Sequence, residues 1–292
     1  MSHIENIHSV DNKLYGPIVV GIGAPKCGTT WFYEAIKKSP HISASVRKEI
    51  SFFSSDKKYD RGMKWYLDHF DYDKKNPHKK TMCEISVSYC YNPAITAKRI
   101  SQHFPHAKIV LFVRDSKERV KSHVDWLRQL EYGEHYDFSE VLSRHPEIIQ
   151  SNNYRFIVEN YLKYFDKDHI CIIRHHSIQN DGVDAVKRFF SFLGIEHDNL
   201  NRIRKEKIGK TITPRFRFLE KMRITIYKTL TRNGHQKIIN LVKLLKIPEF
   251  YRTFNDNRRK KSDLSQAELD KIIGDDYHGF IDWISEKKIT VI

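Results

Sequence analysis

A glycine-containing loop near the start of the chain constrains the fold most strongly. Residues 17–23 form a short apolar run bounded by proline and glycine, which is typical of a buried parallel strand. The loop of residues 23–30 reads GAPKCGTT, and residues 31–38 continue with apolar side chains at helical spacing. A strand, a glycine loop and a helix in this order present backbone N–H groups and a positive helix end to an anion. We predict a phosphate-binding loop here; the alternative is a glycine turn without a ligand.

Strands and helices alternate along the rest of the chain. Apolar runs predict two more strands, and helical spacing predicts four more helices, the last closed by Gly194. The predicted strands lie at residues 108–114 and 169–174, and the predicted helices at residues 95–103, 116–130, 154–165 and 184–193. This alternation predicts an α/β fold with a P-loop-like parallel sheet, flanked by helices on both faces and followed by a basic helical C-terminal segment. Ligands of such folds bind at the carboxyl ends of the strands.

The chain carries a large positive charge, which is concentrated toward its C-terminus. It has 292 residues, with 51 Lys and Arg against 36 Asp and Glu, and a formal net charge of +15. Residues 215–252 hold ten Lys or Arg and two Glu, a local charge of +8. Apolar residues at spacings of three and four predict amphipathic helices over residues 216–247. Such helices either pack on the domain, bind an acidic acceptor or lie on a membrane surface.

Length and composition predict one domain in a reducing compartment. We expect a single domain over residues 1–292, with a nucleotide-binding α/β core at 14–200 and a basic, mostly helical part at 201–292. No apolar run reaches the ~18 residues of a membrane span, and residues 1–15 lack the apolar centre of a signal peptide. We therefore expect a cytoplasmic protein, with peripheral membrane contact through residues 216–247 as the alternative. Four cysteines without a CxxC pair indicate neither a disulfide framework nor a metal site.

The order of residues in the glycine loop disfavours a metal-dependent nucleotide hydrolase or kinase. A Walker A loop places lysine directly after its last glycine, whereas here Lys26 precedes Gly28, and Thr29 and Thr30 follow it. The predicted strand at residues 108–114 ends in arginine instead of an acidic magnesium ligand. We therefore expect an anion site that works without a metal.

Two motifs of the chain occur together in a known family. The first is the loop at residues 25–31, PKCGTTW. The second is Arg114 at a strand end, followed eight residues later by Ser122. The pair resembles the 5′-phosphosulfate and 3′-phosphate motifs of the sulfotransferases that use 3′-phosphoadenosine 5′-phosphosulfate (PAPS), and the resemblance continues to about Trp283. It implies PAPS as co-substrate, adenosine 3′,5′-bisphosphate as product and no metal.

The resemblance also implies roles for the residues of the donor site. Lys26 would contact the oxygen that bridges the sulfuryl group and the 5′-phosphate, and so stabilise the leaving phosphate. Arg114 and Ser122 would bind the 3′-phosphate. Trp31 would stack on adenine unless it is a core residue, and the family's adenine-contacting tyrosine falls at His175. The predicted donor set is Lys26, Cys27, Gly28, Thr29, Thr30, Trp31, Arg114 and Ser122, with a late basic loop carrying Lys207, Gly209 and Lys210.

A glutamate is the candidate general base. Residues 47–53, RKEISFF, resemble the segment of the carbohydrate-type branch whose glutamate takes the acceptor's proton, which assigns that role to Glu49. The alternative is a solvated carboxylate paired with Lys48. The same resemblance places Lys48, Ser88 and Tyr89 in the acceptor cleft, with a packed tyrosine as the alternative for Tyr89.

The resemblance implies sulfuryl transfer from PAPS to a hydroxyl of a sugar or polysaccharide, by metal-independent in-line displacement. Ser51, Ser54 and Ile85 depart from the heparan-type pattern, which disfavours heparan-like acceptor recognition. The first alternative is the same chemistry on a small-molecule or lipid acceptor. A nucleic-acid-binding protein is supported by charge alone, since no zinc finger, RNP motif or basic zipper occurs, so we expect no nucleic-acid partner. A P-loop kinase is the third alternative.

Overall fold

A computed structural model describes residues 15–71, 80–128, 137–196 and 277–292, together with five single residues between positions 222 and 273. The chain forms two compact units. The first comprises Met1–Ser116, Gln150–Glu206 and Asp275–Ile292, and the second comprises Lys117–Ile149 and Lys207–Gly274. The second unit is thus formed by two separate stretches of sequence. The predicted division into an α/β core at residues 14–200 and a basic part at residues 201–292 stays a prediction.

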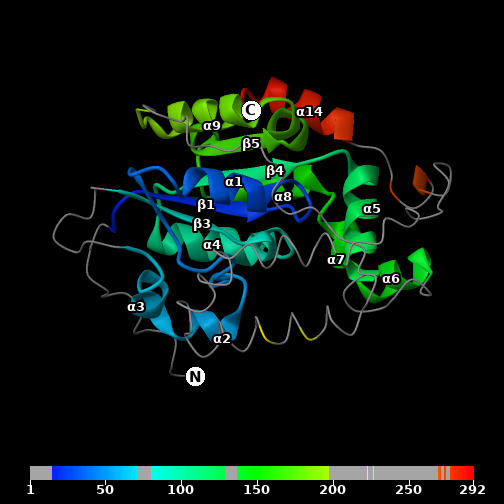
Figure 1. The fold of residues 1–292 in the computed structure, drawn as a ribbon, viewed down its shortest axis with the longest axis horizontal. Helices are drawn as coiled ribbons and strands as arrows, with labels where there is room; N and C mark the ends of the chain where they lie inside the picture. Colours follow the sequence, from blue (N-terminus) through cyan, green and yellow to red (C-terminus); the bar gives the residue numbers. More distant parts are fainter. Residues whose placement is uncertain are drawn as a thin grey trace. The chain divides into compact units, whose positions relative to one another are not determined.

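The first unit is built on a six-stranded sheet in which every neighbouring pair of strands is parallel. The order across the sheet is β2-β3-β1-β4-β5-β6 (Figure 1). The strands are β1 (Ile18–Gly23), β2 (Ile42–Ala44), β3 (Thr81–Ile85), β4 (Lys108–Val113), β5 (Ile170–Arg174) and β6 (Thr290–Val291). Nearly all residues of β1, β3, β4 and β5 are buried, as their apolar composition predicts for strands covered on both faces.

Helices flank the sheet on both faces, and the predicted α/β fold is confirmed. In the first unit, α1 packs beside α9 and α4 packs beside α8. The helices of this unit are α1 (Thr29–Ile36), α2 (Asp56–Tyr59), α3 (Gly62–Leu67), α4 (Pro93–His103), α8 (Tyr154–Tyr161), α9 (His175–Leu193) and α14 (Tyr277–Glu286), with 3₁₀ turns η1 (Val87–Cys90) and η3 (Lys167–His169). Gly194 ends α9 in the left-handed conformation (φ 68°), as predicted for a glycine cap.

Aromatic side chains join the first helix to the sheet. The Phe32 ring on α1 lies 5.2 Å from that of Phe112 on β4 and 5.0 Å from that of Phe189 on α9, both edge to face. Edge-to-face pairs of this kind add about 0.5–1.5 kcal/mol each to simple burial. They hold the first residues of α1 against the middle of the sheet.

The order of strands creates a switch point at β1. From β1 the chain builds β2 and β3 on one side and β4, β5 and β6 on the other. Parallel sheets bind ligands in the crevice at the carboxyl ends of the strands on either side of such a point. The glycine loop follows β1 and therefore lies at this edge of the sheet.

The second unit holds almost all of α5 (Ser116–Leu127), α6 (Phe138–Arg144) and α7 (Glu147–Gln150). Its apolar cluster includes Val120, Phe138 and Ile148, and the fully buried Arg119 donates a hydrogen bond to the Ile148 carbonyl. Ser122, the predicted 3′-phosphate ligand, lies half-buried on α5. In the predicted basic segment 216–247, Met222 and Ile226 are described, and both are helical and exposed.

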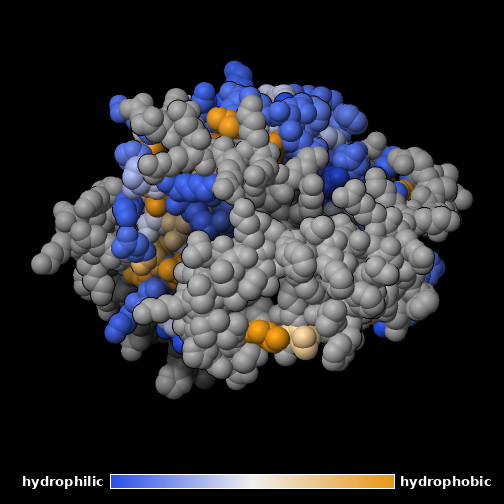
Figure 2. All heavy atoms as spheres, in the orientation of Figure 1, coloured by the Kyte–Doolittle hydropathy of each residue, from blue (hydrophilic) through white to orange (hydrophobic). Residues whose placement is uncertain are grey.

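The surface of the described residues carries charge over the last helices of the first unit. Figure 2 shows hydrophilic side chains gathered over α9 and α14, where Lys187, Arg188, Glu286 and Lys287 are exposed. Within the described part of the chain, no helix is long and apolar enough to cross a membrane.

Candidate active site

The loop between β1 and α1 turns through two left-handed residues. Lys26 has φ 67° and Gly28, the N-cap of α1, has φ 86°. A Cβ atom at Gly28 would lie 3.2 Å from both the His175 ring and Ile178, so glycine is needed for conformation and for space. As a glycine, the N-cap residue Gly28 has no side chain to cap the first turn of α1, and backbone N–H groups at a helix start suit an anion.

Arg114 lies beside this loop, directly after β4. Its guanidinium donates to the Lys26 carbonyl at 3.4 Å. The Tyr154 hydroxyl donates to the Arg114 carbonyl (2.8 Å) and accepts from the Arg114 N–H (3.3 Å), which holds the strand end in place. The structure therefore brings the predicted 3′-phosphate ligand Arg114 next to the predicted 5′-phosphate loop.

A second arginine ends the neighbouring strand. Arg174 pairs with Val113 in the register of β4 and β5. Its side-chain Nε is buried and has no hydrogen-bond partner within the described part of the chain. The sequence predicts a strand that ends at Arg174 but no role for this residue. The available signal is a second strand that, like β4, passes from apolar residues to arginine at the edge where ligands bind.

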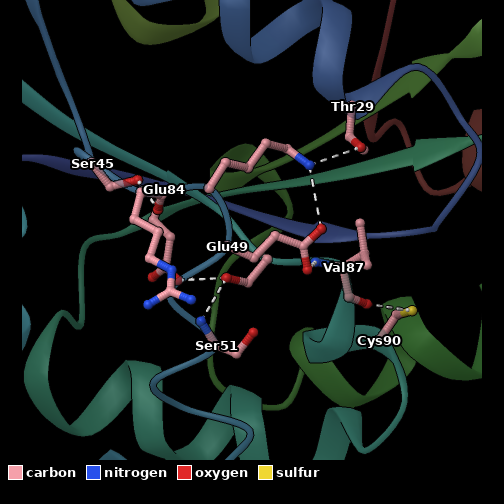
Figure 3. A network of polar contacts seen from close by, with 10 residues as sticks. Thr29, Ser45, Glu49, Ser51, Glu84, Val87 and Cys90 are labelled. Atoms are coloured by element: carbon pink, nitrogen blue, oxygen red, sulfur yellow. Dashed lines mark hydrogen bonds and ion pairs between the residues drawn. The ribbon is translucent and has the colours of Figure 1, made fainter. Parts of the chain in front are cut away.

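A lysine connects the Glu49 carboxylate to the glycine loop. One oxygen, Oε2, accepts from the Val87 N–H at 3.1 Å, and the other, Oε1, lies 3.3 Å from Lys48 Nζ. The same ammonium donates to Thr29 Oγ1 at 3.4 Å, so Lys48 joins the predicted base to the predicted donor loop (Figure 3). The side chains of Lys48 and Glu49 are 14% and 28% exposed, so the pair is partly desolvated but open to a ligand.

Two predicted contact residues are packed into the protein. Trp31 is 8% exposed, and its ring lies against Gly182 of α9, where a Cβ would come within 2.3 Å of it. Tyr89 is fully buried, and its hydroxyl donates to Glu84 Oε1 at 2.7 Å. The surroundings of Trp31 are those of a core residue, and Tyr89 is a packed tyrosine, as the two alternative predictions state. Ligand contacts by these two side chains stay predictions.

A buried carboxylate lies beneath the Glu49 segment. Glu84 on β3 has no exposed surface and accepts from the hydroxyls of Tyr66, Ser86 and Tyr89. Burial raises the pKa of the Glu84 carboxyl, although its hydrogen bonds oppose the rise. Burial, together with the neighbouring Glu84, also raises the pKa of Tyr66 and Tyr89 well above its ordinary value. In the sequence the signal for this site was a glutamate inside an apolar strand.

Most residues of the predicted site belong to the first unit. These residues are Lys26, Cys27, Gly28, Thr29, Thr30, Trp31, Lys48, Glu49, Ser88, Tyr89 and Arg114. Ser88 Oγ lies 2.8 Å from Ser54 Oγ. Ser122 belongs to the second unit, and Lys207, Gly209 and Lys210 lie outside the described residues, so their roles stay predictions. Among the described residues, no group of three His, Cys, Asp or Glu side chains is arranged to hold a metal ion.

Comparison with known proteins identifies the family. A family model described as the sulfotransferase domain matches residues 18–213, more than half of the chain. The chain therefore belongs to the sulfotransferase domain family, as the two nucleotide motifs predict.

Curated relatives share part of the chain. A membrane-associated sulfotransferase of Dictyostelium discoideum is 30% identical over 140 residues, covering 46% of this chain and 29% of the relative. The bifunctional heparan sulfate N-deacetylase/N-sulfotransferase 3 of Homo sapiens is 27% identical over 197 residues, covering 61% of this chain and 22% of the relative. The matched region thus spans less than a third of the length of either relative.

A solved structure supports the fold. The crystal structure of a sulfotransferase from Alicyclobacillus acidocaldarius superimposes with a TM-score of 0.54 at 25% identity, covering 66% of this chain and 86% of that one.

Proposed function

We propose that this protein transfers the sulfuryl group of PAPS to a hydroxyl group of a sugar or polysaccharide. The observation that carries the proposal is the link through Lys48, which lies 3.3 Å from the Glu49 carboxylate and 3.4 Å from Thr29 in the glycine loop. A candidate proton acceptor and a candidate anion cradle thus meet at one edge of the sheet. Sulfuryl transfer requires both groups at one point.

The loop and the strand ends suit a donor with phosphates at two positions. The left-handed glycine N-cap of α1, Gly28, fits a 5′-phosphosulfate bound by backbone N–H groups, Thr29 and Thr30. Arg114, with Ser122 and the late basic loop, would bind the 3′-phosphate. The buried Arg174 Nε has no hydrogen-bond partner among the described residues and fits the same polyanion, because a guanidinium nitrogen in that state favours an anionic ligand.

The reaction would proceed by displacement at sulfur. Glu49 takes the proton of the acceptor hydroxyl while the acceptor oxygen forms its bond to sulfur. The bond between sulfur and the bridging oxygen breaks on the opposite side, and adenosine 3′,5′-bisphosphate leaves with the electron pair. Lys26 lies in the loop that would hold this oxygen, and its ammonium would stabilise the charge that develops there.

The Glu49 segment and one set of relatives favour a carbohydrate acceptor. Residues 47–53 resemble the base segment of carbohydrate-type enzymes, and the human relative is named for heparan sulfate N-sulfotransferase activity. A small-molecule or lipid acceptor is the second candidate, since another relative is named as membrane-associated and Met222 and Ile226 expose apolar side chains in the basic segment. The net charge of +15 matches an acidic acceptor as well as it matches nucleic acid, so charge does not favour nucleic acid.

Titration with adenosine 3′,5′-bisphosphate tests the donor half of the proposal. We expect the same affinity in excess Mg²⁺ and in EDTA, because the site holds its anion with protein groups. Absence of binding would contradict the donor site, and binding that requires Mg²⁺ would favour a P-loop kinase. The acceptor half is tested by transfer of labelled sulfate from PAPS to desulfated polysaccharides, simple phenols and lipid alcohols. Transfer to phenols or lipids alone would exclude the carbohydrate acceptor.

A further inference from the structure

Glu84 connects the sheet to the segment that carries Glu49. It lies in β3, paired in register with Val20 of β1, and has no exposed surface. Its Oε1 accepts from Ser86 Oγ at 2.6 Å and from the Tyr89 hydroxyl at 2.7 Å, and its Oε2 accepts from the Tyr66 hydroxyl at 2.7 Å. Three hydroxyl groups thus converge on one buried carboxyl.

Two of these hydroxyls also accept hydrogen bonds from backbone N–H groups of the residues that follow Glu49. Ser86 Oγ accepts from the Ser51 N–H at 2.9 Å. The Tyr89 hydroxyl accepts from the N–H groups of Phe52 and Phe53 at 3.0 and 3.3 Å. A backbone N–H only donates, and a hydroxyl has one proton. The protons of Ser86 and Tyr89 must therefore point to Glu84 Oε1, which makes this oxygen the common acceptor that orients both hydroxyls.

The segment that these contacts hold needs external support. Ser51 has φ 57°, a left-handed conformation that is unfavourable for a residue with a Cβ. Lys58 adds a further contact by donating to the Ile50 carbonyl at 2.5 Å. Without these partners the backbone next to Glu49 would relax toward more favourable torsion angles, and the Glu49 carboxylate would move away from the Val87 N–H.

We propose, on the basis of the sulfuryl-transfer function proposed above, that Glu84 is a positioning residue that acts through Ser86 and Tyr89 to hold Glu49 at the donor loop. Core stability alone does not call for a carboxyl here, since an apolar side chain on β3 would avoid the cost of burying it. Unlike an apolar side chain, the carboxyl orients the hydroxyls of Ser86 and Tyr89, and these hydroxyls hold the backbone of residues 51–53.

The chain offers a matched pair of variants to test this role. Tyr66 and Tyr89 are both fully buried and both donate to Glu84 at 2.7 Å, but only the Tyr89 hydroxyl also accepts backbone N–H groups of the Glu49 segment. Tyr89→Phe should lower kcat on the order of 10-fold to 100-fold, because a displaced base reacts poorly, while KM for donor and acceptor stays unchanged. Tyr66→Phe should lose similar thermal stability yet keep kcat within about threefold of wild type.

Amide hydrogen exchange gives a readout that does not depend on turnover. The peptide that contains residues 51–53 should exchange on the order of tenfold faster in Tyr89→Phe than in Tyr66→Phe, both compared with wild type. Ser86→Ala should behave like Tyr89→Phe. Equal effects of Tyr66→Phe and Tyr89→Phe on kcat and exchange, or a rise in acceptor KM without loss of kcat, would overturn the positioning role. If the wild type transfers no sulfate to any acceptor, the proposed function fails, whereas exchange still decides whether Glu84 holds this segment.

Discussion

Replacing Glu49 by glutamine separates catalysis from stability most clearly. In the structure, one carboxylate oxygen accepts from the Val87 N–H at 3.1 Å and the other lies 3.3 Å from Lys48 Nζ. Glutamine has the same size and keeps one oxygen for Val87, but it loses the ion pair with Lys48 and it cannot take a proton. The stability effect is therefore limited to a partly exposed ion pair, which contributes about 1 kcal/mol or less.

The expected effect on turnover is much larger. Loss of a general base lowers kcat on the order of 10²–10⁴-fold, which corresponds to roughly 2.7–5.4 kcal/mol of activation free energy. The assay compares kcat, the thermal midpoint and the affinity for adenosine 3′,5′-bisphosphate in Glu49→Gln and wild type, and nucleotide affinity should barely change. Glu34→Gln is the matched control, because Glu34 of α1 also pairs with a lysine, Lys37, at 2.6 Å, and this pair includes neither Lys48 nor Glu49.

A Glu49→Gln variant that keeps wild-type turnover would refute the assignment of the base. Retained activity with an acidic limb of the pH profile near the ordinary histidine value of about 6.5 would indicate a histidine base, and with it a non-carbohydrate acceptor. An equal loss of turnover in Glu34→Gln would show that the rate responds to general destabilisation.

Three further predictions concern the donor site and Glu84. Lys26→Ala should remove most turnover but leave part of the nucleotide affinity, because Lys26 acts on charge that grows in the transition state; near wild-type rates would exclude this role. Arg114→Ala and Ser122→Ala should weaken binding of adenosine 3′,5′-bisphosphate. They should hardly change the affinity for adenosine 5′-phosphosulfate, because that ligand lacks the 3′-phosphate. Equal losses of affinity for the two ligands would show that the wrong phosphate is assigned to these residues. Burial raises the pKa of Glu84 above its ordinary value of 4.5, so between 4.5 and the raised pKa the folded state holds a proton that the unfolded state releases. Over this pH range the stability of the wild type should fall relative to Glu84→Gln as pH rises. Urea unfolding at several pH values measures this slope, which would be opposite if the fold stabilised the carboxyl as the anion.

The fold and the donor loop are predictable from sequence because their signals are local. Apolar runs of five or six residues give β1, β4 and β5, and the glycine loop joins β1 directly to α1. The short strands β2 (3 residues) and β6 (2 residues) carry too little pattern to be predicted, and their pairing depends on partners far along the chain.

The network beneath the site was not predictable in the same way. Glu84 receives hydroxyl protons from residues 18 positions earlier and 2 and 5 positions later, and the amides it organises lie more than 30 positions earlier. No local pattern encodes such contacts, because they exist only once β3 lies beside β1. Glu49, by contrast, was identified from a family resemblance in residues 47–53 and not from the chemistry of its surroundings.

The parallel sheet explains how the proposed donor and acceptor sites share one edge. The loop after β1, the Glu49 segment after β2, the turn after β3 and Arg114 after β4 all emerge at carboxyl ends of neighbouring strands. In the proposed reaction this arrangement places the Glu49 carboxylate close to the polyanionic donor, and like charges at such a distance repel. Lys48 lies between the Glu49 carboxylate and Thr29 of the loop, at 3.3 and 3.4 Å, where one positive charge offsets that repulsion. If Glu49 is the base and the loop binds phosphosulfate, as we propose, the two anions need a cation between them, and Lys48, the residue adjacent to Glu49, supplies it.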